Sequence, residues 1–319
     1  MKYISILLEY IFKDSPLRHL ERYANDSSVF VSARTLVQMY YFFLLFISVA
    51  LFTWDTSFGA QTQIETPWPI GWIPFVGFVA AYTFVRIFFI AASVLAAWKP
   101  HWRPARILSF VALFEFCALY ISILQLDVDG YGLLLTSLLF IFLPLGYEKM
   151  DAPVVVRMKF LLVFFAVQVE NLLTYTMGGI GKLYGAAVQI AAGQSNFFSL
   201  HAPALQIADR QLLTGVHTAL GSWAVEHYLL IYPWYLFTLY LLLFSFFVAF
   251  RPKLHRTWGL LLILFHVGNY LVINIGFVSH IFLWSLLLLA SPFAPTKVSV
   301  KEFLCNLPVV DVVFKKILR

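Results

Sequence analysis

Long apolar runs separated by short polar segments dominate the chain, and this pattern predicts membrane-spanning helices. A helix needs about 20 apolar residues to cross a bilayer, because every backbone polar group must be hydrogen-bonded within the segment. The runs that fit cover residues 30–53, 74–97, 105–126, 131–146, 156–177, 233–250, 258–274 and 276–292. The fourth, seventh and eighth runs are short. The sequence therefore predicts an all-α, polytopic membrane bundle of about eight helices.

Composition supports this fold class and excludes a water-soluble globule. Of the 319 residues, 61% are hydrophobic and only 12% are charged, and the mean hydropathy is +0.83. The formal net charge of +6 indicates contact with anionic lipid, because basic residues near a membrane bind the negatively charged inner leaflet. Without a basic and aromatic recognition motif, nucleic acid is not expected as a partner.

Basic residues gather at both ends of the chain and in alternate loops, which predicts the orientation. The loop clusters are Lys99/Arg103/Arg106, Lys149/Arg157/Lys159 and Arg251/Lys253/Arg256. We expect both termini in the cytoplasm. Lys182 is one of three basic residues outside this pattern.

One transmembrane domain is expected over residues 1–319, with three parts that do not span the bilayer. These are an N-terminal interfacial arm (1–28), an outer-side segment (178–232) and a cytoplasmic interfacial tail (297–319). Cys117 lies in a predicted helix and Cys305 in the tail, so neither a disulfide nor a metal cluster is expected.

Two oppositely charged residues fall near mid-bilayer in neighbouring predicted helices. At about 1.5 Å per residue, Arg86 in the second helix and Glu115 in the third reach similar depths. A structural ion pair that holds the two helices in register is favoured over a functional role.

The outer end of the fifth predicted helix is polar on nearly every side. Gln168, Asn171 and Tyr175 share one face, and Glu170 and Thr174 lie on another at i and i+4. Such a helix end must be buried by protein.

Near the C-terminus, a second set of polar residues reaches the same depth as Glu170. His266, Asn269 and Tyr270 share a face of the seventh helix, and His280 begins the eighth. The two histidines lack the spacing and acidic company of a zinc site, so no metal is expected. A lone buried histidine is more often a packing residue than a functional one.

Lys182 follows the glycine-rich residues 177–181 at the outer end of the fifth helix. A lysine there can simply extend its ammonium to the interface, and the glycines can serve close helix packing or helix termination. A phosphate loop is excluded, since Thr176 stands where that motif needs glycine and Leu183 where it needs Ser or Thr.

Two short blocks resemble the horizontally transferred transmembrane (HTTM) domain family, which includes the vitamin K-dependent gamma-carboxylases. Residues 175–183 (YTMGGIGKL) look like that family's Y-x-x-A/G-G-x-x-K-L signature. Residues 265–277 (FHVGNYLVINIGF) resemble its histidine helix, which ends in an I-G-x-F turn. The blocks occur in the family's order.

This resemblance implies a carboxylase- or oxygenase-like membrane enzyme. Lys182 would be the weak base that starts oxygenation of a reduced quinone, with His266 and Glu170 as orienting groups and the remaining polar residues binding substrate. Burial favours a neutral amine, which can accept a proton. The substrate-binding candidates are Gln168, Asn171, Tyr175, Asn269, Tyr270 and His280.

A membrane domain of this length resembles the family's standalone bacterial members, among them one that helps mature a sporulation-delaying peptide toxin. The resemblance implies a bacterial inner-membrane protein that modifies a peptide or a quinol-like substrate at the outer face. The alternative is a non-catalytic membrane partner that binds a secreted peptide during maturation or export, together with a small soluble protein. A transporter is less favoured, because no inverted repeat is visible.

Overall fold

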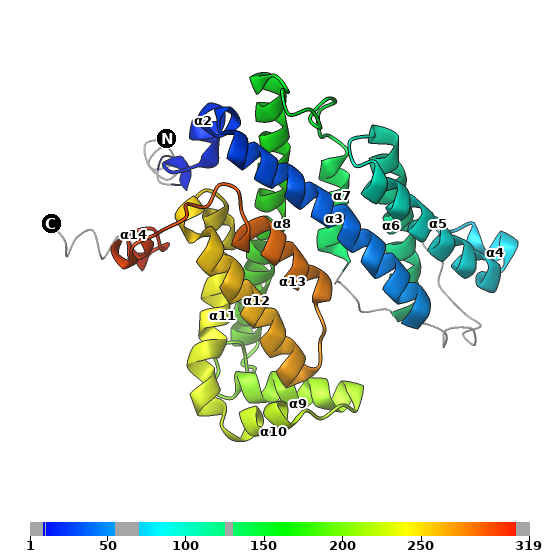
Figure 1. Cartoon of the computed structure of the whole chain (residues 1–319). Coiled ribbons are helices and arrows are strands. Elements are labelled where there is room, and N and C mark those ends of the chain that lie inside the picture. Colours follow the sequence, from blue (N-terminus) through cyan, green and yellow to red (C-terminus); the bar gives the residue numbers. More distant parts are fainter. Residues whose placement is uncertain (1–8, 10, 55–69, 125–129, 311–319) are drawn as a thin grey trace. The chain divides into compact units, whose positions relative to one another are not determined.

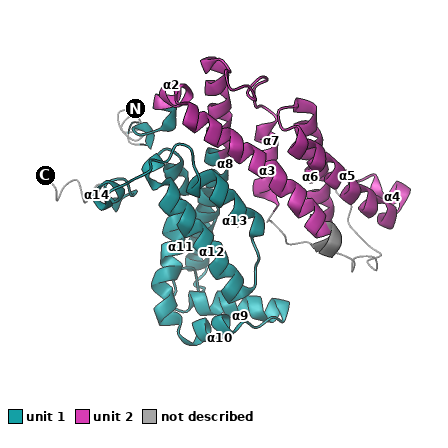
Figure 2. Ribbon diagram, viewed as in Figure 1, with its two compact units in different colours: residues 1–18, 168–319 teal, residues 19–167 magenta. Residues whose placement is uncertain are grey.

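The computed structural model describes residues 9, 11–54, 70–124 and 130–310 of the chain, and these residues form helices and no strands (Figure 1). The predicted all-α class is confirmed. Two compact units are present (Figure 2). Unit 1 comprises Met1–Arg18 and Gln168–Arg319, and unit 2 comprises His19–Val167.

Unit 2 is a bundle of apolar helices. Its helices are α2 (Leu20–Asn25), α3 (Ser27–Trp54), α4 (Ile73–Val76), α5 (Phe78–Trp98), α6 (Arg103–Leu124), α7 (Tyr131–Phe140) and the first part of α8 (Val154–Ala191). Gly77 separates α4 from α5, and its φ of +82° is a left-handed conformation that glycine adopts without a Cβ clash.

The core of unit 2 contains aromatic side chains whose polar ends are satisfied. Tyr40 of α3 is 1% exposed. Its hydroxyl donates to the Leu133 carbonyl at 2.7 Å and lies 2.6 Å from the Ser137 hydroxyl. These contacts join α3 to α7, and the Phe140 ring packs edge-on against Tyr40. A buried tyrosine is stable here because its hydroxyl has partners.

Unit 1 contains the second part of α8 and the helices that follow it in the sequence. They are α9 (Ala202–Thr214), α10 (Ala219–Glu226), α11 (Tyr228–Ala249), α12 (His255–Ile273), α13 (Val278–Trp284), a π-helical turn (Ser285–Leu289) and α14 (Val300–Leu304), with short 3₁₀ turns at Pro16–His19 and Pro252–Leu254. Helices α9 and α10 lie across one end of α11 and α12 (Figure 1). Thr218 caps α10 and also donates to the Val272 carbonyl at 2.8 Å, which fastens α10 to the end of α12.

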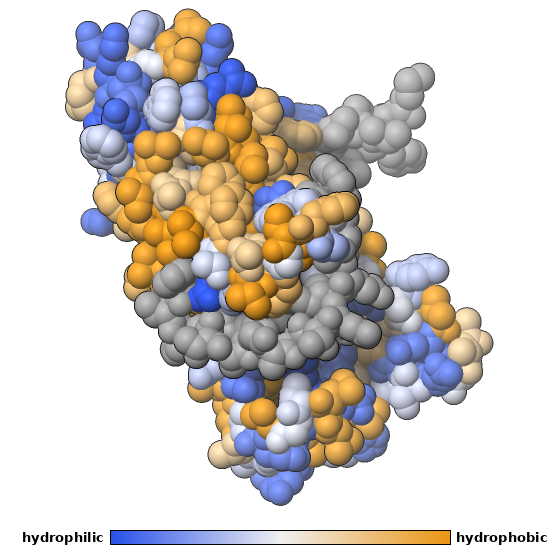
Figure 3. Space-filling model, turned by 90° about the vertical axis from the view of Figure 1, so that its right-hand side faces the viewer, coloured by the Kyte–Doolittle hydropathy of each residue, from blue (hydrophilic) through white to orange (hydrophobic). Residues whose placement is uncertain are grey.

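Among the described residues, six helical segments are long and apolar enough to cross a membrane, as expected of a multi-pass membrane protein. They are Ser27–Leu51, Phe78–Trp98, Arg103–Ser122, Val154–Ala191, Tyr228–Ala249 and Pro252–Ile273. The fourth and eighth predicted spans correspond to shorter apolar helices, Tyr131–Phe140 and Val278–Leu289. One face of the molecule shows hydrophobic residues gathered into a broad patch below a cap of hydrophilic ones (Figure 3). The predicted cytoplasmic position of both termini stays a prediction.

The fifth predicted helix is longer than expected, which changes the surroundings of Lys182. The sequence predicts its end at residue 177, but α8 continues through the glycines to Ala191, over 38 residues. Single glycines weaken a helix by only about 1 kcal/mol each, and tertiary packing offsets that cost. A Cβ atom at Gly179 would lie 2.9 Å from the Leu243 backbone nitrogen, so the missing side chain lets α11 approach α8 closely. Lys182 is therefore a helical residue.

Candidate functional site

A buried cluster in unit 1 joins a tyrosine, a histidine and a tryptophan from three helices. Tyr175 lies on α8, His266 on α12 and Trp284 at the end of α13, and their exposed fractions are 8%, 3% and 0%. The Trp284 Nε1 atom donates to the Tyr175 hydroxyl at 3.0 Å. The same hydroxyl is hydrogen-bonded to His266 Nε2. The cluster therefore connects three helices through one hydroxyl oxygen.

The chemistry of these groups sets the direction of the hydrogen bonds. An indole N–H can only donate, so the Tyr175 oxygen accepts from Trp284. The proton of the Tyr175 hydroxyl is then available to His266 Nε2. A neutral imidazole with its proton on Nδ1 accepts at Nε2. In this arrangement a proton can pass between the Tyr175 hydroxyl and the His266 imidazole.

Aromatic rings surround this hydrogen-bond chain. The His280 and Phe277 rings lie 5.2 Å and 4.8 Å from the His266 ring, centroid to centroid. The Trp284 ring packs edge-on against Tyr175 at 4.8 Å. These rings exclude water, and an electrostatic interaction gains strength where water is excluded.

The structure brings together three of the residues that the sequence analysis selected, namely Tyr175, His266 and His280. Two members of the cluster were missed, Trp284 and Phe277. Trp284 falls one helical turn after His280, and its indole N–H lies within an apolar helix, where a polar hydrogen needs a partner. That requirement is the signal in the sequence that points to Trp284.

Lys182 lies farther along α8 than the cluster. It follows Tyr175 by seven residues, so at 3.6 residues per turn both share a helix face and are separated by about 10 Å along the axis. The Lys182 ammonium lies 5.7 Å from the centroid of the Phe197 ring, which fits a cation–π contact. Its role as a base, with His266 as an orienting group, stays a prediction.

Glu170 forms a local hydrogen-bond group on α8. Its carboxylate accepts from the Asn171 amide at 3.1 Å and from the Thr174 hydroxyl at 3.2 Å. The second of these contacts is the i, i+4 pair that the helical spacing predicts. Asn171 is buried, whereas Thr174 is exposed.

Gln168 belongs to a second buried hydrogen-bond chain in unit 1. Its amide nitrogen donates to the Leu287 carbonyl and, at 3.0 Å, to the Ser291 hydroxyl. That hydroxyl lies 2.8 Å from His255 Nδ1, and His255 Nε2 lies 3.2 Å from the Ala249 carbonyl. Because a carbonyl only accepts, His255 carries its proton on Nε2 and accepts from Ser291. Through this hydrogen-bond chain, the Gln168 amide connects α8 to the π-helical turn Ser285–Leu289.

Asn269 and Tyr270 help to end α12. The Tyr270 carbonyl accepts from the Asn274 backbone nitrogen at 3.0 Å, and Asn274 adopts the left-handed conformation that commonly closes a helix. The Tyr270 side chain is exposed and Asn269 is half-buried. Substrate binding by these residues stays a prediction.

Arg86 and Glu115 in unit 2 each have a partner. Arg86 donates to the Leu51 carbonyl at 2.7 Å, and its guanidinium lies 4.9 Å from the Tyr82 ring centroid. Glu115 accepts from the Trp72 indole nitrogen at 3.3 Å. The ion pair between Arg86 and Glu115 stays a prediction.

Within the described part of the chain, no three His, Cys, Asp or Glu side chains are grouped as a metal site would need. Comparison of the chain with protein-family models, with curated proteins and with solved structures finds no match.

Proposed function

We propose that this chain is an integral membrane enzyme that transfers protons to and from a lipid-soluble or peptide substrate at the cluster of Tyr175, His266 and Trp284. The observation that carries the proposal is the Tyr175 hydroxyl, which accepts from Trp284 and is hydrogen-bonded to His266. A phenol held against a buried imidazole is suited to general acid–base chemistry. The six membrane-capable helices in the described part of the chain support a substrate that reaches the site from lipid.

Lys182 is the proposed base, by resemblance to the carboxylase membrane domain. Its ammonium lies over the Phe197 ring, and its position on the Tyr175 face of α8 is compatible with a substrate that spans both groups. A reduced quinone is the proposed cosubstrate, because the resemblance implies oxygenation of one. In this proposal the protein lies in a bacterial inner membrane with both termini in the cytoplasm.

The proposal is tested by oxygen uptake of the full chain in lipid nanodiscs supplied with a reduced naphthoquinone. We expect uptake above that of empty nanodiscs, and a decrease of about 10²-fold or more in Lys182→Ala, the scale of a lost general base. Lys149→Gln removes an exposed positive charge from unit 2 and should keep wild-type uptake. The proposal fails if Lys182→Ala and Lys182→Arg both keep full uptake, or if the wild type shows none.

A non-catalytic peptide-binding function is the second candidate, and exposed leucines on α9 favour it. Leu212 and Leu213 are 79% and 82% exposed, and Trp223 of α10 is 42% exposed. An apolar surface of this kind can bind an amphipathic peptide. A photo-crosslinker at Leu213 should then capture a secreted peptide that mass spectrometry identifies. Labelling of lipid alone would argue against this function.

A further inference from the structure

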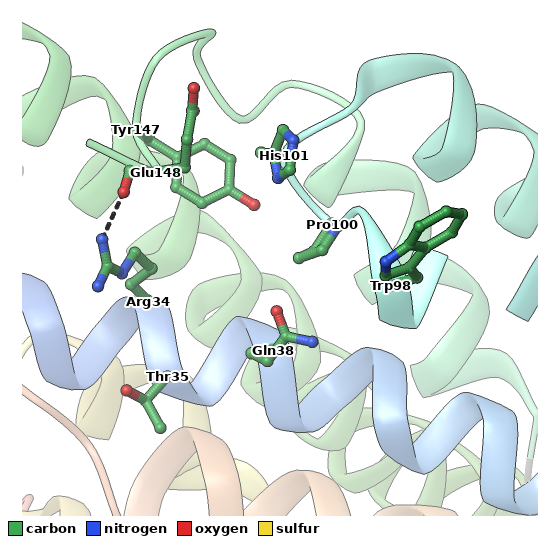
Figure 4. A pocket seen from close by; sticks show the side chains of 8 residues that line it. All are labelled: Arg34, Thr35, Gln38, Trp98, Pro100, His101, Tyr147 and Glu148. Atoms are coloured by element: carbon green, nitrogen blue, oxygen red, sulfur yellow. Dashed lines mark hydrogen bonds between the residues drawn. The ribbon is translucent and has the colours of Figure 1, made fainter. Parts of the chain in front are cut away.

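Unit 2 contains a pocket of about 380 Å³ that the sequence analysis does not predict (Figure 4). It is lined by Arg34, Thr35 and Gln38 of α3, Trp98 at the end of α5, Pro100 and His101 of the following loop, and Tyr147 and Glu148 of the loop before α8. Its volume is at the lower end of the range for small-ligand sites. The pocket therefore has room for a compact polar group.

A buried arginine behind the pocket holds its two loops in place. Arg106 is 0% exposed. Its guanidinium donates to the carbonyls of Pro100 at 2.8 Å, His101 at 2.9 Å and Leu143 at 2.9 Å. One side chain thus fixes the loop after α5 to the segment after α7. Loops fixed in this way make a pre-formed binding site.

Two charged side chains line the pocket, the cation of Arg34 and the carboxylate of Glu148. The Arg34 guanidinium donates to the Glu148 backbone carbonyl at 2.6 Å and approaches the Met150 sulfur at 3.2 Å, and both of these acceptors are uncharged. In Figure 4 the Glu148 side chain points away from Arg34. Arginine presents five N–H donors in a planar fork that suits phosphate oxygens. The guanidinium can therefore donate to an anionic ligand.

Tyr147 adds a hydrogen-bond donor inside the pocket. The residue is only 2% exposed, and its hydroxyl proton has no acceptor among the described residues, since the neighbouring Arg106 guanidinium can only donate to the hydroxyl oxygen. Figure 4 shows this hydroxyl directed into the space between His101 and Gln38. Burial raises the pKa of Tyr147 to about 12, so the hydroxyl keeps its proton at neutral pH. A buried donor without an acceptor is costly, and a ligand oxygen would satisfy it.

Exposed apolar residues lead away from the pocket along two helices. Thr35 lines the pocket, and Met39, Phe42 and Phe46 follow it on one face of α3 at helical spacing, with exposed fractions of 46%, 54% and 65%. On α5, Val94 and Ile87 continue the face of Trp98 and are 47% and 53% exposed. Lipid acyl chains pack on surfaces of this kind.

We propose that this pocket binds the phosphate of an anionic phospholipid, with Arg34 and Tyr147 donating to phosphate oxygens and the acyl chains lying along the exposed faces of α3 and α5. Lys99, whose ammonium lies 4.6 Å from the Trp98 ring centroid, adds positive charge at the rim. A soluble phosphate would make no use of the apolar faces, which favours a lipid. This inference does not depend on the proposed enzymatic function.

Native mass spectrometry of the purified full chain tests the proposal, with phosphatidylglycerol as the anionic probe and phosphatidylcholine as the neutral one. We expect the wild type to bind one phosphatidylglycerol about tenfold more tightly than phosphatidylcholine, a difference of the size that a charge-assisted hydrogen bond supplies. Arg34→Gln should abolish this preference, and Tyr147→Phe should weaken phosphatidylglycerol binding about threefold or more. Arg256→Gln removes an exposed charge in unit 1 and should change nothing. Wild-type preference in both pocket variants would overturn the proposal.

Two further measurements on the wild-type protein remain decisive if Arg34→Gln fails to fold. Inorganic phosphate should not displace phosphatidylglycerol, and equal displacement would assign the pocket to a soluble phosphate instead. A photoactivatable phosphatidylglycerol should label peptides of α3 and α5 near the pocket, detected after proteolysis. Labelling spread evenly over all lipid-facing helices would show only bulk lipid contact and overturn the specific site.

Discussion

The indole nitrogen of Trp284 donates to the Tyr175 hydroxyl across 3.0 Å, and this contact joins α13 to α8 inside unit 1. The same hydroxyl is also hydrogen-bonded to His266 Nε2, so it has two polar partners. All three side chains are buried. Removing the hydroxyl would leave a buried indole N–H without an acceptor, so the contact should contribute to stability as well as to any chemistry.

Tyr175→Phe should therefore destabilise the protein by about 1–3 kcal/mol, the cost of leaving buried polar groups unsatisfied. Thermal unfolding in detergent, followed by tryptophan fluorescence, measures the change. A double-mutant cycle with Trp284→Phe should give a coupling free energy of about 0.5 kcal/mol or more, because the two groups are in contact. Strictly additive effects would mean that the hydrogen bond contributes nothing to stability.

The close approach of α8 and α11 should make Gly179 intolerant of a side chain. A Cβ there would lie 2.9 Å from the Leu243 nitrogen and 3.1 Å from the Leu242 Cβ, so Gly179→Ala must push the helices apart. We expect a loss of about 1–3 kcal/mol in unfolding free energy, as for other overpacked cores.

Its neighbour Gly178 provides a matched control, since a Cβ there meets nothing within 4 Å. Gly178→Ala should be neutral, or stabilising by up to about 1 kcal/mol through helix propensity. Both variants are compared by the same thermal unfolding assay. Equal effects of the two substitutions would contradict the close packing at Gly179.

Arg106→Lys should destabilise unit 2 although it keeps the positive charge. The Arg106 guanidinium reaches three carbonyls on two loops, and a single ammonium cannot match that planar geometry. Because buried carbonyls would lose their hydrogen bonds, we expect the unfolding free energy to fall by about 2–4 kcal/mol. The exposed Arg103 is the control, and Arg103→Lys should change the unfolding free energy by less than about 0.5 kcal/mol. Similar unfolding temperatures for both variants would contradict this role of Arg106.

Acid should weaken the capping box of α14, in which the side chains of Ser299 and Glu302 each accept a hydrogen bond from the other residue's backbone nitrogen. The Lys253 ammonium, 2.8 Å from the Glu302 carboxylate, lowers the pKa of Glu302 to about 2, and hydrogen bonds from Ser299 add to the shift. Because the folded-state pKa lies below the ordinary 4.5, the stabilisation is fully present above about pH 4.5 and is lost as the pH falls through about 2.

An NMR titration of the Glu302 carboxyl carbon measures this pKa in the full chain. Lys253→Gln should raise the midpoint toward 4.5, whereas Lys301→Gln, which removes a neighbouring charge from α14, should have a smaller effect. A midpoint near 4.5 in the wild type would show that the contact does not persist in solution.

The amino-acid sequence by itself determined the helical class and the membrane character. A span is recognised from about 20 consecutive apolar residues, which is a local property, and six of the predicted runs coincide with membrane-capable helices. Polar residues within those runs identified Tyr175, His266 and His280, because a buried polar group in an apolar helix needs a partner.

Only the tertiary structure decided which groups meet. Tyr175 is 91 residues from His266 and 109 from Trp284 in the sequence, and no local pattern specifies such pairs. The end of α8 was also decided by packing, since contact with α11 at Gly179 offsets the weak helix propensity of the glycines. The pocket at Arg34 and Tyr147 likewise depends on Arg106, which hydrogen-bonds to backbone carbonyls of two loops. Every residue has a backbone carbonyl, so the sequence does not indicate which of them Arg106 will contact.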